Sequence, residues 1–166
     1  MVKRRSYSAH DIARVLLAIT DPEDNDVSNL KLQKLCYYAQ GILSAMRGTP
    51  LFLDKIEAWD HGPVVPVLYH DYKRYGSSPI AINGDFDEAA YDPADIKALR
   101  DVMEYYSQFS PWRLRNMTHE EAPWLNAYNQ PNREIPVDAL IAHFRPIIKD
   151  DYVRSVYGSE MVTEEA

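Results

Sequence analysis

The chain has 166 residues, 46% of them hydrophobic and 26% charged, a balance that is typical of a folded globular protein and excludes disorder as its main state. Its net charge of −7 repels nucleic-acid phosphates on average and therefore disfavours DNA or RNA as a partner. We expect one domain over residues 1–166, with a core at about 8–157 and a frayed acidic tail at 158–166.

The only cysteine, Cys36, excludes an internal disulfide. The basic N-terminal residues are not followed by the apolar run of a signal peptide, and no later stretch approaches membrane-spanning length. These features predict a cytoplasmic protein with no membrane contact.

The first predicted helix begins after the cap Ser8 and ends at Asp21-Pro22. A second helix begins after Ser28 and ends at Gly48. Its apolar stripe consists of Leu32, Leu35, Cys36, Ala39, Leu43 and Met46. Because Lys31 and Lys34 lie outside this stripe, they are predicted to face water or a partner.

Alternating apolar and polar residues over 56–59 predict a short strand, which we expect to pair with residues 80–82. Gly62-Pro63 is predicted to begin a third helix. Further helices are expected to begin at Pro93, after Ser110, near Pro123 and near Pro136. The predicted fold class is therefore mainly α: one helical domain of about six helices with a minor two-stranded β element.

Metal and nucleophile chemistry find little support in the residue spacing. Four histidines lie among acidic residues: His61, His70, His119 and His143. No two of them are one helical turn apart, and the chain has no pair of cysteines, so the spacing does not match a zinc site. Cys36 lies on an apolar helix stripe, where a buried thiol packs in the core and is a poor nucleophile. We expect no metal, no cofactor, no catalytic residue and no small-molecule substrate.

The segment Asp60-His61-Gly62-Pro63 is a candidate for contact with another protein. Gly62 relaxes the backbone, Pro63 sets the direction of the chain that follows, and Trp59 flanks the His61 ring. Such a corner can bind an acidic or aromatic group of another protein. The alternative is structural, with Trp59 in the core and His61 holding the turn together.

Several blocks of the sequence resemble the SocA-like (Panacea) antitoxin family. The resemblance extends roughly from residue 8 to residue 144 and rests on SNLKLQKLCYYAQG at 28–41, PLF at 50–52, EAW at 57–59, GPV at 62–64, Tyr69, and THEEAPW at 118–124. It implies an antitoxin of a bacterial or prophage toxin-antitoxin pair that neutralises a cognate protein toxin by direct binding. It implies no enzymatic activity and no cofactor.

On that basis we predict a toxin-binding surface formed by the second helix, the Trp59 corner and the third helix, with seven contact residues: Lys31, Gln33, Lys34, Tyr38, Trp59, His61 and Tyr69. Two alternatives stay open: an adaptor or regulator of a phage or mobile element that binds host proteins, and a hydrolase using His61 or His119. Assembly into a homo-oligomer also stays open.

Overall fold

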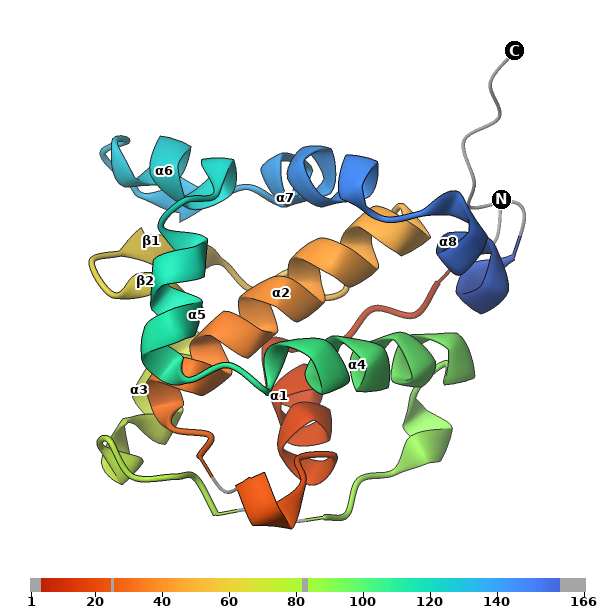
Figure 1. Ribbon diagram of the computed structural model, residues 1–166, viewed down its shortest axis with the longest axis horizontal. Helices are drawn as coiled ribbons and strands as arrows, with labels where there is room; N and C mark the ends of the chain where they lie inside the picture. The colour runs from red at the N-terminus through yellow and green to blue at the C-terminus, as the bar shows by residue number, and fades with distance from the viewer. Residues whose placement is uncertain (1–3, 25, 82–83, 159–166) are drawn as a thin grey trace.

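The computed structural model describes residues 4–24, 26–81 and 84–158 and is mainly helical, as the sequence predicts (Figure 1). Within these residues the α-helices are α1 (Ala9–Ala18), α2 (Asn29–Arg47), α3 (Pro66–Tyr72), α4 (Pro93–Tyr106), α5 (Pro111–Thr118), α6 (Ala122–Tyr128), α7 (Val137–Phe144) and α8 (Asp150–Tyr157). The strands are β1 (Ile56–Trp59), β2 (Gly62–Val64) and β3 (Glu134–Ile135). The 3-10 helices are η1 (Pro22–Asp24), η2 (Lys73–Tyr75), η3 (Glu88–Ala90) and η4 (Arg145–Ile147).

The first two helices begin, and α2 ends, where capping chemistry predicts, whereas α1 ends at Ala18, three residues before the predicted Asp21-Pro22. Ser8 Oγ accepts a hydrogen bond from the amide of Asp11, and the Asp11 carboxylate accepts one from the amide of Ser8. Ser28 Oγ caps α2 by accepting one hydrogen bond from the amide of Lys31, and Gly48 ends the helix with a φ of 75° that suits a residue without a side chain. Both predicted helices are confirmed.

Helix α2 is the central element of the fold. It crosses the middle of the molecule, with α7 on one side and α1 and α4 on the other (Figure 1), and it also contacts α3, α5, α8 and β2. Gly41 allows the ring of Phe144 on α7 to pack directly against the α2 backbone. Because neighbours surround α2, 17 of its 19 residues are buried, including most of its polar ones.

The sheet has three antiparallel strands in the order β2-β1-β3. Trp59 pairs with Gly62, and Ile56 pairs with Ile135, 79 positions further along the chain. The predicted partner of β1 at 80–82 is wrong. The Ile80 amide instead donates to the Val27 carbonyl at 2.8 Å, and residue 82 lies outside the described residues.

The prediction that Gly62-Pro63 begins a helix is also wrong. These residues form β2, because Gly62 has a φ of 115° and turns the chain back along β1. The helix that follows, α3, begins at Pro66, which occupies the first turn without loss of a hydrogen bond.

The described residues contain two more helices than the predicted six. The additional elements are short, and α8 has eight residues. Its Val153 and Tyr157 are buried and belong to the same hydrophobic core as α2 and α4. Most of the predicted acidic tail, residues 159–166, lies outside the described residues.

Candidate functional site

A buried polar network joins the N-terminal end of α2 to β2 and α3. The Asn29 amide nitrogen donates to the Tyr69 carbonyl at 3.1 Å, and Gln33 Nε2 donates to Asn29 Oδ1 at 2.8 Å. Gln33 Oε1 accepts from the Val65 amide at 2.9 Å. The 28–41 segment, which carries part of the family resemblance, therefore contacts β2 and α3 through Val65 and Tyr69 and holds the start of α3 in place.

The prediction that Lys31 and Lys34 lie on a surface facing water or a partner is wrong, because their relative exposures are 0% and 1%. Gln33 and Tyr38, predicted as contact residues with them, are also buried. Lys31 Nζ donates to Asp26 at 2.8 Å and to the Ser107 carbonyl at 2.7 Å, so it connects α2 to the end of α4. The amphipathic pattern indicated one buried face, but α2 is enclosed by several elements.

Lys34 is the unusual member of this buried set. Among the described residues its Nζ has no hydrogen-bond partner. Burial, and to a smaller extent the nearby Arg115 charge, together lower the pKa of Lys34 to about 7. A β-carbon on Gly62 would lie 2.8 Å from Lys34 Cε, so the glycine leaves the room that the lysine side chain occupies.

Tyr37 and Tyr38 both donate to the carboxylate of Glu121, at 2.9 and 3.0 Å. The Tyr38 ring also stacks on Tyr106 with centroids 3.9 Å apart. Burial raises the pKa of Glu121 to about 7, although the two hydroxyl hydrogen bonds act in the opposite direction. This cluster connects α2, α4 and the start of α6 and leaves Tyr38 with no exposed surface.

The corner at Trp59 and His61 is exposed or half-buried, as a contact surface requires. The Trp59 ring packs edge-on against Tyr69 on α3, with centroids 5.0 Å apart. The Tyr128 hydroxyl donates to Asp60 at 2.5 Å and lowers the pKa of that carboxyl. The turn is thus fixed on both sides, while the His61 ring stays exposed.

His119, the second histidine of the hydrolase alternative, is engaged at both ring nitrogens. Nδ1 lies 2.7 Å from the Arg115 carbonyl and Nε2 lies 2.9 Å from the Asp60 carbonyl. Both partners are acceptors, so only the doubly protonated ring donates to both. The ring also packs on Trp124 with centroids 3.9 Å apart, and it joins α5 to the β1–β2 turn.

No three His, Cys, Asp or Glu side chains come together as potential metal ligands within the described part of the chain. Cys36 is fully buried, and that burial raises the pKa of its thiol far above the ordinary value. Its environment is that of a core residue.

A surface hollow of about 560 Å³ lies between the N-terminal end of α2, α3 and the start of α5. We call it the His61 groove; the residues of its lining that matter here are Leu30, His61, Tyr69, Lys73 and Pro111. Leu30 is 38% exposed although it is a leucine on the central helix. The groove thus combines apolar side chains with a histidine and a lysine.

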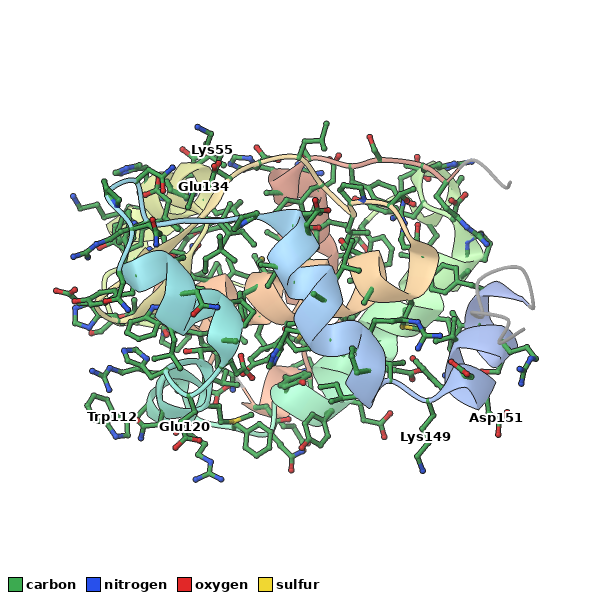
Figure 2. The ribbon with its side chains drawn as sticks, turned by 90° about the horizontal axis from the view of Figure 1, so that it is seen from above. Lys55, Trp112, Glu120, Glu134, Lys149 and Asp151 are labelled. Carbon is green, nitrogen blue, oxygen red and sulfur yellow. The ribbon has the colours of Figure 1, made fainter. Side chains whose placement is uncertain are left out.

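The side of α5 next to the groove carries a further exposed aromatic residue. Trp112 is 66% exposed and lies at the outer edge of the molecule, on the same side as Glu120 (Figure 2). The Arg115 guanidinium lies over its ring, 4.7 Å from the centroid. Trp112 and Arg115 thus form an aromatic–cation pair near the start of α5, next in sequence to the groove residue Pro111.

Of the seven predicted contact residues, His61 and Tyr69 line the groove and Trp59 packs beside it. The other four are buried beneath it or further along α2. Leu30, Lys73 and Pro111 were not predicted. Leu30 could have been predicted from the sequence, because an apolar residue outside the apolar stripe of a helix indicates exposed contact area.

The chain belongs to a family of antitoxin domains. The family model "Antitoxin SocA-like, Panacea domain" matches residues 32–125, which contain most of α2, the whole β1–β2 hairpin, and α3 to α5. The family resemblance expected from the sequence is thereby confirmed.

Antitoxin SocA of Caulobacter vibrioides (strain NA1000 / CB15N) is 40% identical over 72 residues, which make up 43% of this chain and 38% of that protein. The chain thus matches less than half of the length of this curated relative. No solved structure matches the chain. None of the described helices is long and apolar enough to cross a membrane.

Proposed function

We propose that the protein is a cytoplasmic antitoxin that neutralises a protein toxin by binding it at the His61 groove. The observation that carries this proposal is membership of the SocA-like antitoxin family over residues 32–125. The groove residues lie within that matched region, apart from the three at the start of α2, residues 28–30. A docking surface on the family's shared segment suits a function that the family shares.

The lining of the groove has the composition of a protein interface. Leu30, Tyr69 and Pro111 supply apolar area, and His61 and Lys73 supply polar groups at the edge. An apolar centre with a polar rim is the usual arrangement of such surfaces, and aromatic residues contribute disproportionately to their affinity. We therefore assign direct toxin contact to His61, Tyr69 and the neighbouring Trp59.

The buried residues of the predicted set have a supporting role in this proposal. Gln33 bonds to the Val65 amide at the start of α3, and Lys31 bonds to the end of α4. Tyr38 fixes the start of α6 through Glu121. These contacts hold the groove walls in register, so their loss would lower toxin affinity through the shape of the surface.

Binding is better supported than hydrolysis. Both ring nitrogens of His119 face backbone carbonyls, which leaves neither free to act as a general base. His61 lies on an exposed corner and not within an enclosed, substrate-sized cavity. Neither residue meets the geometric requirements of a catalytic centre.

The test is rescue of growth together with co-purification. The affinity-tagged chain is expressed in its native host, the protein that co-purifies is identified, and that protein is expressed alone to measure growth arrest. We expect arrest, and rescue when the wild-type chain is co-expressed. His61→Ala combined with Tyr69→Ala should abolish both rescue and co-purification.

Lys97→Ala on the exposed side of α4 is the control variant, because Lys97 forms a surface ion pair with Asp101 and does not line the groove. It should rescue as the wild type does. Full rescue by a folded His61→Ala, Tyr69→Ala variant would contradict the assignment of the groove. A wild-type chain that binds no growth-arresting protein would contradict the antitoxin function itself.

A further inference from the structure

Two cationic side chains, the buried Lys34 and the half-buried Arg115, each follow a groove-lining residue by one helical turn. On α2, Leu30 lines the groove and Lys34 follows one helical turn later on the same face. On α5, Pro111 lines the groove and Arg115 follows by the same four positions. Both walls of the groove therefore lead to a basic side chain.

The direction of the two side chains agrees with this spacing. Side chains on a helix tilt toward its N-terminus, so Lys34 and Arg115 extend toward the groove end of α2 and α5. The Arg115 guanidinium lies over Trp112, three residues earlier on α5 and one residue after Pro111. Lys34 Nζ would lie 3.3 Å from a β-carbon on Gly62, the residue next to His61.

Lys34 is the less satisfied of the two, because the Arg115 guanidinium lies over Trp112 and its Nη1 donates to Asn116 Oδ1 at 3.2 Å. Within residues 4–24, 26–81 and 84–158, Lys34 Nζ and Arg115 Nε are both buried and have no hydrogen-bond partner. The charge of Arg115 acts on Lys34 and disfavours its protonation. Burying a cation without an anion costs several kcal/mol as an order of magnitude, and a second cation nearby increases that cost.

We propose that the base of the His61 groove is a carboxylate-binding site, where Lys34 and Arg115 pair with an acidic side chain of the toxin that docks in the groove. This inference rests on the proposed function, since it names the chemistry of the toxin at the same surface. The matching toxin segment is an acidic residue flanked by apolar ones, which Leu30, Tyr69 and Pro111 contact. A carboxylate placed there would satisfy both orphan donors at once.

The first experiment measures toxin affinity by isothermal titration calorimetry, with the growth-arresting protein that co-purifies with the full-length chain. Lys34→Met and Arg115→Met remove one cation each while keeping a long unbranched side chain. Each should weaken binding at least about 30-fold, because truncating one member of a buried charge pair has effects of that size. Lys97→Met and Arg100→Met, at exposed positions of α4, should change it less than about 3-fold.

A second readout separates the ion pair from a purely structural role. A carboxylate beside Lys34 favours its charged form, so the wild-type complex should take up a proton when it forms at pH 8. Titrations in two buffers with different ionisation enthalpies measure that uptake. It should disappear in Lys34→Met and persist in Lys97→Met.

A third experiment needs no toxin. Sodium acetate is titrated into lysine-labelled wild-type protein, and the Nζ resonance of Lys34 is followed by NMR with Lys97 as internal reference. We expect a saturable shift of Lys34 alone, with sodium chloride at equal ionic strength giving none. A Lys34 signal that acetate moves no more than it moves Lys97 would overturn the site.

The outcomes separate the two levels of the proposal. Suppose that the wild-type chain binds its toxin, and that Lys34→Met and Arg115→Met bind it equally well and with the same proton uptake. The proposed carboxylate-binding site is then wrong, and the antitoxin function stands. If the wild-type chain binds no growth-arresting protein, the proposed function is wrong, and the acetate titration still decides whether the anion site exists.

Discussion

Arg47 and Asp95 form an ion pair in the centre of the protein, with 3.3 Å between Nη1 and Oδ2 and both side chains fully buried. The Asp95 carboxylate also accepts hydrogen bonds from Tyr7 at 2.8 Å and from Tyr157 at 2.5 Å. One carboxylate therefore joins α2, α4, α8 and the segment before α1. It connects the two ends of the described chain to the central helix.

Replacing Asp95 by Ala should destabilise the fold by about 3–5 kcal/mol, because it leaves the Arg47 charge buried without a partner. Urea unfolding at pH 7 measures the change. Asp101→Ala is the control, since Asp101 pairs with Lys97 at the surface and receives one tyrosine hydrogen bond. A loss below about 1 kcal/mol for Asp95→Ala would contradict the central role of the ion pair.

Glu121 should make the protein less stable as the pH rises through the acidic range. Its pKa of about 7 in the fold lies above the ordinary value of 4.5, so the folded state holds a proton that the unfolded state releases between these values. The free energy of unfolding should fall by up to about 3 kcal/mol from pH 4.5 to pH 7. Glu121→Gln should flatten that slope; an unchanged slope would contradict the assignment.

Lys34 should change the stability of the protein at higher pH than Glu121 does, and in the opposite direction. Its pKa in the fold is about 7 against an ordinary value of 10.5, so between these values the unfolded state binds the extra proton and stability rises with pH. Lys34→Met should remove this rise and stabilise the free protein at pH 7 by roughly 2–4 kcal/mol. Unfolding curves at pH 7 and pH 10 measure it. A destabilised Lys34→Met would show that the lysine is already paired.

Gly62→Ala should cost about 1–3 kcal/mol, because φ is 115° and the new methyl group would meet Lys34 Cε. Gly84→Ala is the matched control, since nothing lies within 4 Å of its β-carbon position and no positive φ is recorded there. Thermal unfolding of both variants compares them. Equal melting temperatures would contradict the close approach of Lys34 and Gly62.

The ends of α1 and α2 could be predicted from the sequence because their causes are local. Ser8 and Ser28 bond to amides three residues away, and Gly48 adopts its own left-handed conformation. The same reasoning failed at Gly62, whose role depends on pairing of Trp59 with Gly62 across the turn. It failed again for β3, because residues 134–135 pair with a strand far away in the sequence.

The candidate site could be predicted only at its exposed corner. His61 and Tyr69 could be predicted because they lie near Trp59 in the sequence, close to the EAW and GPV segments that carry the family resemblance. Lys34 was selected for the wrong reason, as a solvent-facing residue, because periodicity cannot show that neighbours cover every face of α2. Pro111 and Lys73 enter the groove from distant segments, and only the tertiary fold brings them together.

The most direct test of the account compares two exposed leucines. Leu30 lines the His61 groove and is 38% exposed, whereas Leu125 on α6 is 43% exposed and lies outside it. The affinity of the toxin for Leu30→Glu and for Leu125→Glu is measured at pH 7. We expect Leu30→Glu to weaken binding at least about 30-fold, and Leu125→Glu to change it less than about 3-fold. Equal affinities for the two folded variants would contradict docking at the groove.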